Sequence, residues 1–249
     1  MNQYKIHPIV MGTKIFDKGM MTYQHAYGEP YTIPIYCWYL EGGYQKILVD
    51  TGEMSPIRSE SREKAIGGKI YDFEDGLALW DLSPNDIDVV VHTHLHNDHC
   101  ENDFKCVNAT FYIHEQELAR IHDPHPLDFR YLEDYILDIE ENGQIKTIAE
   151  DQEILPGIQV THTPAHTEGG LTVLINTSQG EAAITGFCVI MDNFFPPKEI
   201  QAMEIDVIPP GTPVNVYESY DILVKVKNMA DILLPLHEPK FASTNTIPV

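Results

Sequence analysis

The stretch His94-Leu95-His96-Asn97-Asp98-His99 decides how this chain of 249 residues is interpreted, and it comes just after the apolar run Ile87-Asp88-Val89-Val90-Val91. That run is short and rich in β-branched residues, as in strands that are buried on both faces. The six-residue stretch is therefore expected in a loop at the end of a buried strand. A chain of this length and histidine content contains the pattern HxHxDH by chance only about two times in a thousand. The pattern therefore indicates a functional site.

The residue types in this loop are those that bind divalent metal ions. Zn²⁺ and similar cations accept imidazole nitrogens and carboxylate oxygens as ligands. Residues two apart in an extended loop project to the same side. We therefore expect His94 and His96 to serve one ion, and Asp98 and His99, beyond the bend, to serve another. The predicted cofactor is a pair of divalent cations, with zinc as the first expectation and iron or manganese as alternatives.

Apolar segments on both sides of the histidine loop define the expected fold. A first group of strands is predicted at residues 4–10, 31–40, 46–49, 87–91 and 110–113. A second group is predicted at residues 145–149, 158–162, 171–175, 182–185 and 232–236. Helices are expected at 115–121 and 214–229, the second with apolar residues at helical spacing. Two strand-rich halves, each crossed by a helix, predict an α+β layered sandwich with outer helices.

The length predicts one domain, residues 1–249, with two segments that do not follow the strand pattern. Residues 53–80 combine a polar, glycine-containing stretch with an amphipathic one. Residues 122–143 are acidic and aromatic and contain two prolines. Both segments are candidate lids over the histidine loop.

Acidic residues dominate the charge of the chain. Sixteen Lys and Arg against 38 Asp and Glu give a formal net charge of −22. This charge disfavours nucleic acid and acidic membrane surfaces as partners and favours a neutral or modestly charged small-molecule substrate. The chain contains no long apolar run and no signal-peptide layout at its N-terminus, so we expect a cytoplasmic protein without membrane association. The motifs GxSxG, GxxxxGKS/T and GxGxxG are absent, which argues against serine-hydrolase and nucleotide-binding chemistry.

The histidine motif resembles that of a known family. HxHxDH after an apolar strand, preceded by Leu48-Val49-Asp50-Thr51-Gly52, is similar to the pattern of the metallo-beta-lactamase superfamily, and the resemblance extends over most of the chain. It implies an αββα four-layer sandwich. Motif order and length are most similar to the N-acyl homoserine lactonase branch. Asp50 stands at a strand end and is expected to accept a hydrogen bond from a ligand histidine; the alternative is a solvated turn aspartate.

The resemblance also implies metal ligands outside the loop. His166, in Thr163-Pro164-Ala165-His166, is similar to the third histidine of the first metal, with His162 as the rival. His237 matches the last histidine ligand. The family places a bridging aspartate after the next apolar strand, where this chain has Cys188. Cys188 is the expected ligand there; Asp192, or no bridging side chain, are the alternatives. The expected ligand set is His94, His96, Asp98, His99, His166, Cys188 and His237.

The family likeness implies a hydrolase. We expect a metal-activated hydroxide to open a lactone or ester of a small molecule, with Asp98 as the catalytic group that passes a proton to the leaving alkoxide. Met191 stands where lactonase relatives have a tyrosine that holds the substrate carbonyl, so acyl-chain specificity does not carry over. The alternatives are an iron-dependent redox or dioxygenase member of the superfamily, and a non-catalytic metal-bound domain that binds a ligand. A homodimer is one expected state of the chain.

Overall fold

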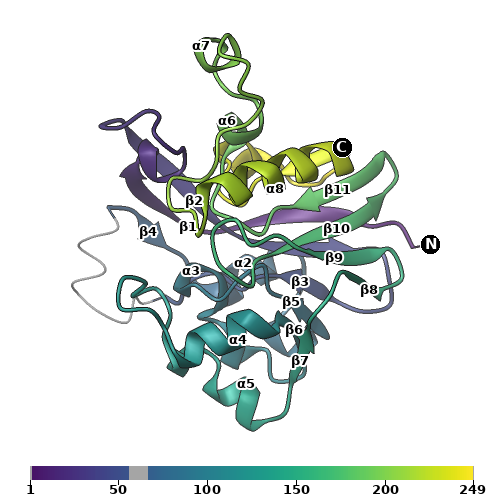
Figure 1. The fold of residues 1–249 in the computed structure, drawn as a ribbon. Coiled ribbons are helices and arrows are strands. Elements are labelled where there is room, and N and C mark those ends of the chain that lie inside the picture. The colour runs from purple at the N-terminus through teal and green to yellow at the C-terminus, as the bar shows by residue number, and fades with distance from the viewer. Residues whose placement is uncertain (1, 56–66, 249) are drawn as a thin grey trace.

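Two β-sheets pack face to face in the computed structural model, which describes residues 2–55 and 67–248 (Figure 1). In this part of the chain the first sheet has seven strands in the order β4-β1-β2-β3-β5-β6-β7, and the second has five in the order β12-β11-β10-β9-β8. The first-sheet strands are β1 Lys5–Asp17, β2 Pro30–Glu41, β3 Ile47–Val49, β4 Lys69–Ile70, β5 Val89–Val91, β6 Thr110–His114 and β7 Ile145–Ile148. The second-sheet strands are β8 Gln152–Leu155, β9 Ile158–His162, β10 Leu171–Thr177, β11 Gly180–Ile184 and β12 Ile232–Leu234.

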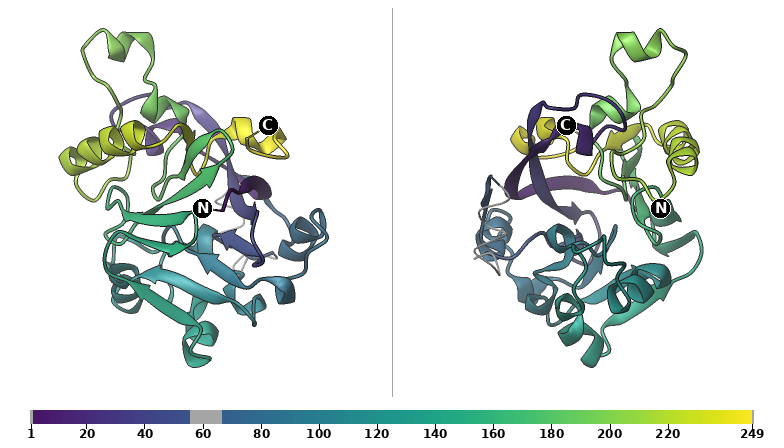
Figure 2. Two further views of the ribbon diagram at one scale, coloured as in Figure 1. Left: turned by 90° about the vertical axis from the view of Figure 1, so that its right-hand side faces the viewer. Right: turned by 60° about the vertical axis from the view of Figure 1, so that its left-hand side comes forward.

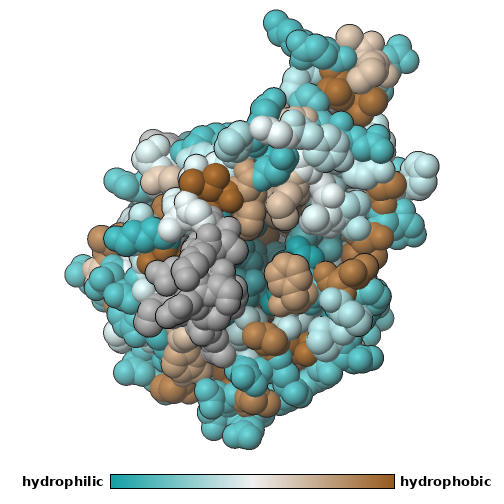
Figure 3. Space-filling view, turned by 90° about the vertical axis from the view of Figure 1, so that its left-hand side faces the viewer, coloured by the Kyte–Doolittle hydropathy of each residue, from teal (hydrophilic) through white to brown (hydrophobic). Residues whose placement is uncertain are grey.

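Helices cover the outer faces of both sheets (Figures 1 and 2). Against the first sheet lie α2 Phe73–Ala78, α4 Glu115–His122 and α5 Leu137–Glu141; α3 Asn97–Cys100 begins within the histidine motif. Across the second sheet lies α8 Val216–Met229, which begins after Asn215 because the Asn215 side chain accepts from the N–H groups of Tyr217 and Glu218. Two short helices, α6 Met191–Phe194 and α7 Lys198–Gln201, lie on a segment that projects from the body of the molecule. Figure 3 shows hydrophobic side chains on this projection.

Three apolar layers hold the four structural layers together. Successive residues of a strand point to opposite faces, and β2 shows this directly. Trp38 and Leu40 pack between the two sheets, with Val173 of β10 among their neighbours in that cluster. Cys37 and Tyr39 instead face the outer helices of the first sheet. A third cluster joins α8 to the outer face of the second sheet. The predicted αββα sandwich is therefore confirmed.

Several elements differ from the prediction. The placement of residues 145–149 in the second group of strands is wrong, because β7 pairs in parallel with β6 at the edge of the first sheet. β1 continues to Asp17 instead of ending at residue 10, with a register shift between Val10 and Gly12. The short strands β4 and β8 were not expected, since β8 is polar and no more than half-buried. In the candidate lid 53–80, residues 56–66 lie outside the described part of the chain. The rest of this segment includes β4 and α2. Phe73 and Leu77 of α2 are buried in the cluster between the first sheet and its outer helices. Among the described residues, no helix combines the length and apolar character that a membrane crossing requires.

Candidate metal centre

The histidine motif lies at one edge of the sandwich, where several strands end. β3, β5 and β6 run parallel, so the loops that follow them begin at the same edge of the first sheet. The N–H of Asp50 donates to the carbonyl of Val91 over 3.1 Å, and the N–H of Thr51 donates to the carbonyl of His99 over 2.7 Å. The loop after β3 thereby fixes both ends of the histidine loop. Asp50 adopts a left-handed φ of +59°, which is unfavourable for a residue other than glycine.

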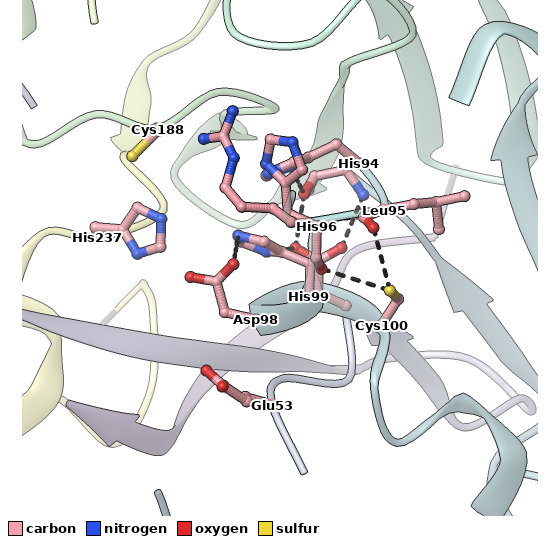
Figure 4. Close-up of polar contacts among 12 residues, drawn as sticks. Glu53, His94, Leu95, His96, Asp98, His99, Cys100, Cys188 and His237 are labelled. Carbon is pink, nitrogen blue, oxygen red and sulfur yellow. Dashed lines mark hydrogen bonds and ion pairs between the residues drawn. The ribbon is translucent and has the colours of Figure 1, made fainter. Parts of the chain in front are cut away.

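Six side chains form two groups, and in each group the ligand atoms lie within 4.8 Å of one another. They are the two groups of this kind found within residues 2–55 and 67–248. His166 follows β9 and His237 follows β12, so the second sheet contributes one histidine to each group. Figure 4 shows His237 facing the motif from the side of Asp98. The first group contains His94, His96 and His166, and the second contains Asp98, His99 and His237.

Backbone carbonyls fix the orientation of the two distant histidines. Nδ1 of His166 lies 2.9 Å from the carbonyl oxygen of Thr212, and Nδ1 of His237 lies 3.0 Å from that of Pro34. A carbonyl oxygen only accepts, so Nδ1 of each ring carries a proton. Burial lowers the pKa of His237 to about 4 and the pKa of His166 well below its usual value. Both rings are therefore neutral, and each keeps a lone pair on Nε2.

Asp50 orients two histidines of the motif. Its carboxylate accepts from Nδ1 of His99 over 2.8 Å and from the hydroxyl of Thr93 over 2.7 Å. Because the Thr93 hydroxyl proton is used in this way, its oxygen accepts from Nδ1 of His94, 3.2 Å away. Nε2 of both histidines is then left as a lone pair. The predicted hydrogen bond from a histidine of the motif to the Asp50 carboxylate is confirmed, and the solvated-turn alternative is wrong because Asp50 is fully buried.

These lone pairs fit a metal ion. In the described part of the chain, Nε2 of His99 is buried and has no hydrogen-bond partner, which is costly unless another ligand satisfies the nitrogen. Burial lowers the pKa of His99, but the carboxylates of Asp98 and Asp50 outweigh burial and the net pKa is raised. A divalent cation satisfies such a nitrogen and carboxylate together. The donor set therefore suits the ions predicted from the sequence.

Asp128 and Arg130, in the candidate lid 122–143, adjoin the first group. Nε2 of His96 lies 3.1 Å from a carboxylate oxygen of Asp128, which leaves Nδ1 of His96 as the lone pair. Arg130 donates to both oxygens of Asp128, over 2.6 and 2.8 Å, and its Nη1 lies 3.2 Å from Nε2 of His166. Burial opposes ionisation of Asp128, but His96 and Arg130 outweigh it and hold the pKa well below its usual value.

We expect Asp128→Ala to weaken metal binding at the first group by about 10- to 100-fold, the range found when a carboxylate that orients a ligand histidine is removed. The physical reason is that His96 loses the acceptor that fixes its tautomer. Competition of the metal-free protein against a zinc chelator measures the affinity. The control is Asp134→Ala, which removes an exposed carboxylate from the same segment. Equal affinities in both variants would contradict the assignment.

Cys188 lines a cavity that all six side chains of the two groups also line, but it belongs to neither group. Its thiol donates to the sulfur of Met21 over 3.6 Å, and burial raises its pKa to about 12. Figure 4 shows Cys188 near His237 and apart from the motif. Its role as a ligand stays a prediction. Asp192, the alternative, forms an ion pair with Lys18 over 2.7 Å, and His162, the rival of His166, lies outside both groups.

Lys14 and Glu53 lie beside the second group and were not predicted from the sequence. Nζ of Lys14 lies 2.6 Å from Glu53 and 3.3 Å from Asp98. The predicted strand ended before Lys14, so no expectation existed for this residue. A lysine between Thr13 and the apolar pair Ile15-Phe16 gave no clear signal of a buried charge.

The two groups open into a shared cavity of about 210 Å³. Polar side chains, including those of Lys14 and Arg130, form part of the lining. The rest of the lining is apolar and includes Phe129 of the candidate lid 122–143. A site of this kind suits a small molecule with a polar reacting centre and an apolar part. The other apolar lining residues include Phe16, Met20, Met21 and Ile33.

Comparison with known proteins gives consistent matches. The family model of the metallo-beta-lactamase superfamily matches residues 31–186. An N-acyl homoserine lactonase from Bacillus sp is 27% identical over 190 residues, covering 70% of this chain and 71% of that protein. An N-acyl homoserine lactonase from Bacillus cereus is 26% identical over 191 residues, with 70% and 71% coverage.

Solved structures are similar over nearly the whole chain. A quorum-quenching N-acyl homoserine lactone lactonase superposes with a TM-score of 0.77 at 23% identity, covering 98% of this chain and 95% of that one. A Bacillus thuringiensis AiiA mutant with N-decanoyl-L-homoserine at its active site gives a TM-score of 0.76 at 22% identity, with 96% and 95% coverage. At these identities the structural likeness shows the fold.

Proposed function

Since the chain belongs to the metallo-beta-lactamase superfamily, we propose that it is a hydrolase of small-molecule lactones or esters that works with two divalent cations, zinc first. The observation that carries the proposal is the pair of facing groups in one cavity, in which hydrogen bonds leave a lone pair on one nitrogen of each histidine. The superfamily and these groups support the use of divalent metal. The relatives named as lactonases support a lactone as the first substrate to test.

The proposed ligands are His94, His96 and His166 for one ion and Asp98, His99 and His237 for the other. When bound, two divalent cations supply Lewis acidity that lowers the pKa of water from 15.7 toward about 7 and polarises a carbonyl. The protein supplies position. Asp50, Asp128 and the carbonyls of Pro34 and Thr212 hold the histidine rings in place.

Asp98 is the proposed carrier of the proton. Its carboxylate lies in the cavity, 3.7 Å from Nε2 of His99. Burial opposes its ionisation, but Lys14 and the neighbouring histidines outweigh burial and hold its pKa well below the usual value. Asp98 is therefore an anion that can accept a proton from the attacking water and pass it to the leaving alkoxide. Phe16 and Ile33 provide an apolar surface for the rest of the substrate.

A panel of lactones, carboxylic esters and thioesters tests this function. The lactones include N-acyl homoserine lactones of several chain lengths, because Met191 gives no guide to the acyl chain. With Zn²⁺ in excess we expect release of acid from at least one lactone class, measured by titration at constant pH. Chelator treatment abolishes the activity and added Zn²⁺ restores it. Full activity after complete metal removal, or iron-dependent redox chemistry with no hydrolysis, would contradict the proposal.

A further inference from the structure

A buried lysine lies directly against the second group. The side chain of Lys14 is 6% exposed, and that of Glu53 is fully buried. Nζ of Lys14 lies 2.6 Å from the Glu53 carboxylate and 3.3 Å from Oδ2 of Asp98, which is a member of the group. Figure 4 shows Glu53 on the Asp98 side of the cluster. An ammonium group in this position competes for an oxygen that a metal ion would use.

The first group has a different electrostatic setting. Its three members are histidines, and the adjacent cation, Arg130, makes two hydrogen bonds with Asp128. Nη1 of Arg130 also lies 3.2 Å from Nε2 of His166, a member of the first group, but both oxygens of Asp128 offset the charge of Arg130, and Asp128 belongs to neither group. Arg130 is also more exposed than Lys14, with 29% of its side chain accessible against 6%. Solvent therefore screens the charge of Arg130 more than that of Lys14.

Charge compensation at the second group is limited. Lys14 divides its charge between Glu53 and Asp98, and Asp98 is the one carboxylate of the two groups. Cys188, at the position where the family places a bridging aspartate, lies outside both groups. A dication at the second group therefore meets an ammonium that is held in place by the fold, and Asp98 is the one carboxylate among the group's own three members; Glu53 and Asp50 act from outside the group, through Lys14 and His99. Like charges at this range in a buried site repel strongly.

We propose that Lys14 weakens the hold of the second group on its cation, so that the ion at Asp98, His99 and His237 is the exchangeable one and the ion at His94, His96 and His166 is the resident one. This inference rests on the two-metal site of the proposed function. Lys14 acts through Asp98 and is a positioning residue. Its charge sets the metal occupancy of the site.

Titration of the metal-free protein with Co²⁺ tests the proposal without any substrate. Calorimetry gives the affinities and the visible absorption of Co²⁺ reports coordination. We expect two binding phases in the wild-type chain, with dissociation constants at least about tenfold apart, a difference of the size that neighbours of metal ligands produce. His166→Ala and His237→Ala assign the phases, since each removes one member of one group.

Two variants move the weak phase in opposite directions. Lys14→Gln keeps a hydrogen-bond donor for Glu53 and Asp98 but removes the positive charge. We expect it to lower the dissociation constant of the weaker Co²⁺-binding phase by about tenfold or more. Glu53→Gln leaves the whole lysine charge on Asp98 and weakens the same phase further. Lys14→Arg keeps the positive charge, so the dissociation constant of the weaker phase stays high.

The matched control is Arg130→Gln, which changes the dissociation constant of the tighter phase and leaves that of the weaker phase unchanged. Circular dichroism verifies the fold of each variant, and Glu53→Gln provides the test alone if Lys14→Gln does not fold.

The outcomes separate this inference from the proposed function. Two unequal phases that respond to Lys14→Gln support the inference even if no lactone is hydrolysed. Equal affinities in the wild-type chain overturn it, even if lactones are hydrolysed. A weak phase that stays within twofold of wild type in both Lys14→Gln and Glu53→Gln overturns it as well.

Discussion

Replacing His96 by alanine is expected to lower the turnover of the best substrate by about 1000-fold or more, because the first group would lose one of its three proposed ligand nitrogens and with it the ion whose Lewis acidity the proposed reaction needs. His96 lies on the short loop between β5 and α3, so the sandwich core is untouched. Steady-state kinetics with the best substrate of the panel, at saturating Zn²⁺, measures the effect.

The control for this prediction is His162→Ala. His162 is also a histidine near the end of a strand, but it lies outside both groups, and its Nε2 donates to the backbone carbonyl oxygen of Glu168, 2.8 Å away. We expect the turnover of the His162→Ala variant to stay within a few-fold of that of the wild-type chain. Unchanged turnover in His96→Ala, with normal circular dichroism, would remove His96 from the site.

The second large effect is expected for Asp50→Ala. The substitution leaves the Thr93 hydroxyl, the Thr93 N–H and Nδ1 of His99 without their buried acceptor. Burial raises the pKa of Asp50, but His99 and His92 outweigh burial and lower it to about 2, so a buried charge is lost from a network built around it. We expect a loss of about 3 kcal/mol or more of unfolding free energy, together with weaker metal binding.

Chemical denaturation of the metal-free protein measures the unfolding free energy, and metal titration measures the affinity for metal. Asp72→Ala is the matched control, because Asp72 is exposed and its side chain makes no capping hydrogen bond to the following helix. Its unfolding free energy is expected to change by less than about 0.5 kcal/mol. If Asp50→Ala changed stability no more than Asp72→Ala, the central role of Asp50 would be wrong.

Local sequence signals predicted the parts of the site that depend on local structure. The β-branched run before the motif predicted a buried strand, and the structure has β5 there. The spacing of His94 and His96 predicted that they lie together, and both are members of the first group. Asp50 was predicted from its position at the end of an apolar strand. Parallel pairing of β3 with β5 explains why that position adjoins the motif. His166 and His237 were identified by resemblance to a family, since nothing local brings them to the motif.

The parts that escaped prediction depend on long-range packing. The register shift between Val10 and Gly12 changes the alternation of β1, so the face of Lys14 does not follow from the residues before it. Asp128 and Arg130 lie in an irregular segment without a repeating pattern. Their contacts with His96 and His166 arise from the folding of the segment over the sheet edge. Such contacts carry no signal in the spacing of residues.

The division of each group between the two sheets has a consequence for the whole molecule. His94, His96, Asp98 and His99 come from the first sheet, whereas His166 and His237 come from the second. An ion bound at either group would therefore cross-link the two halves of the sandwich and would add its binding free energy to the folded state alone. On the proposed function, metal removal is expected to shorten the lifetime of the protein as well as to stop its reaction, because a chain without these cross-links unfolds more often and is then open to proteases.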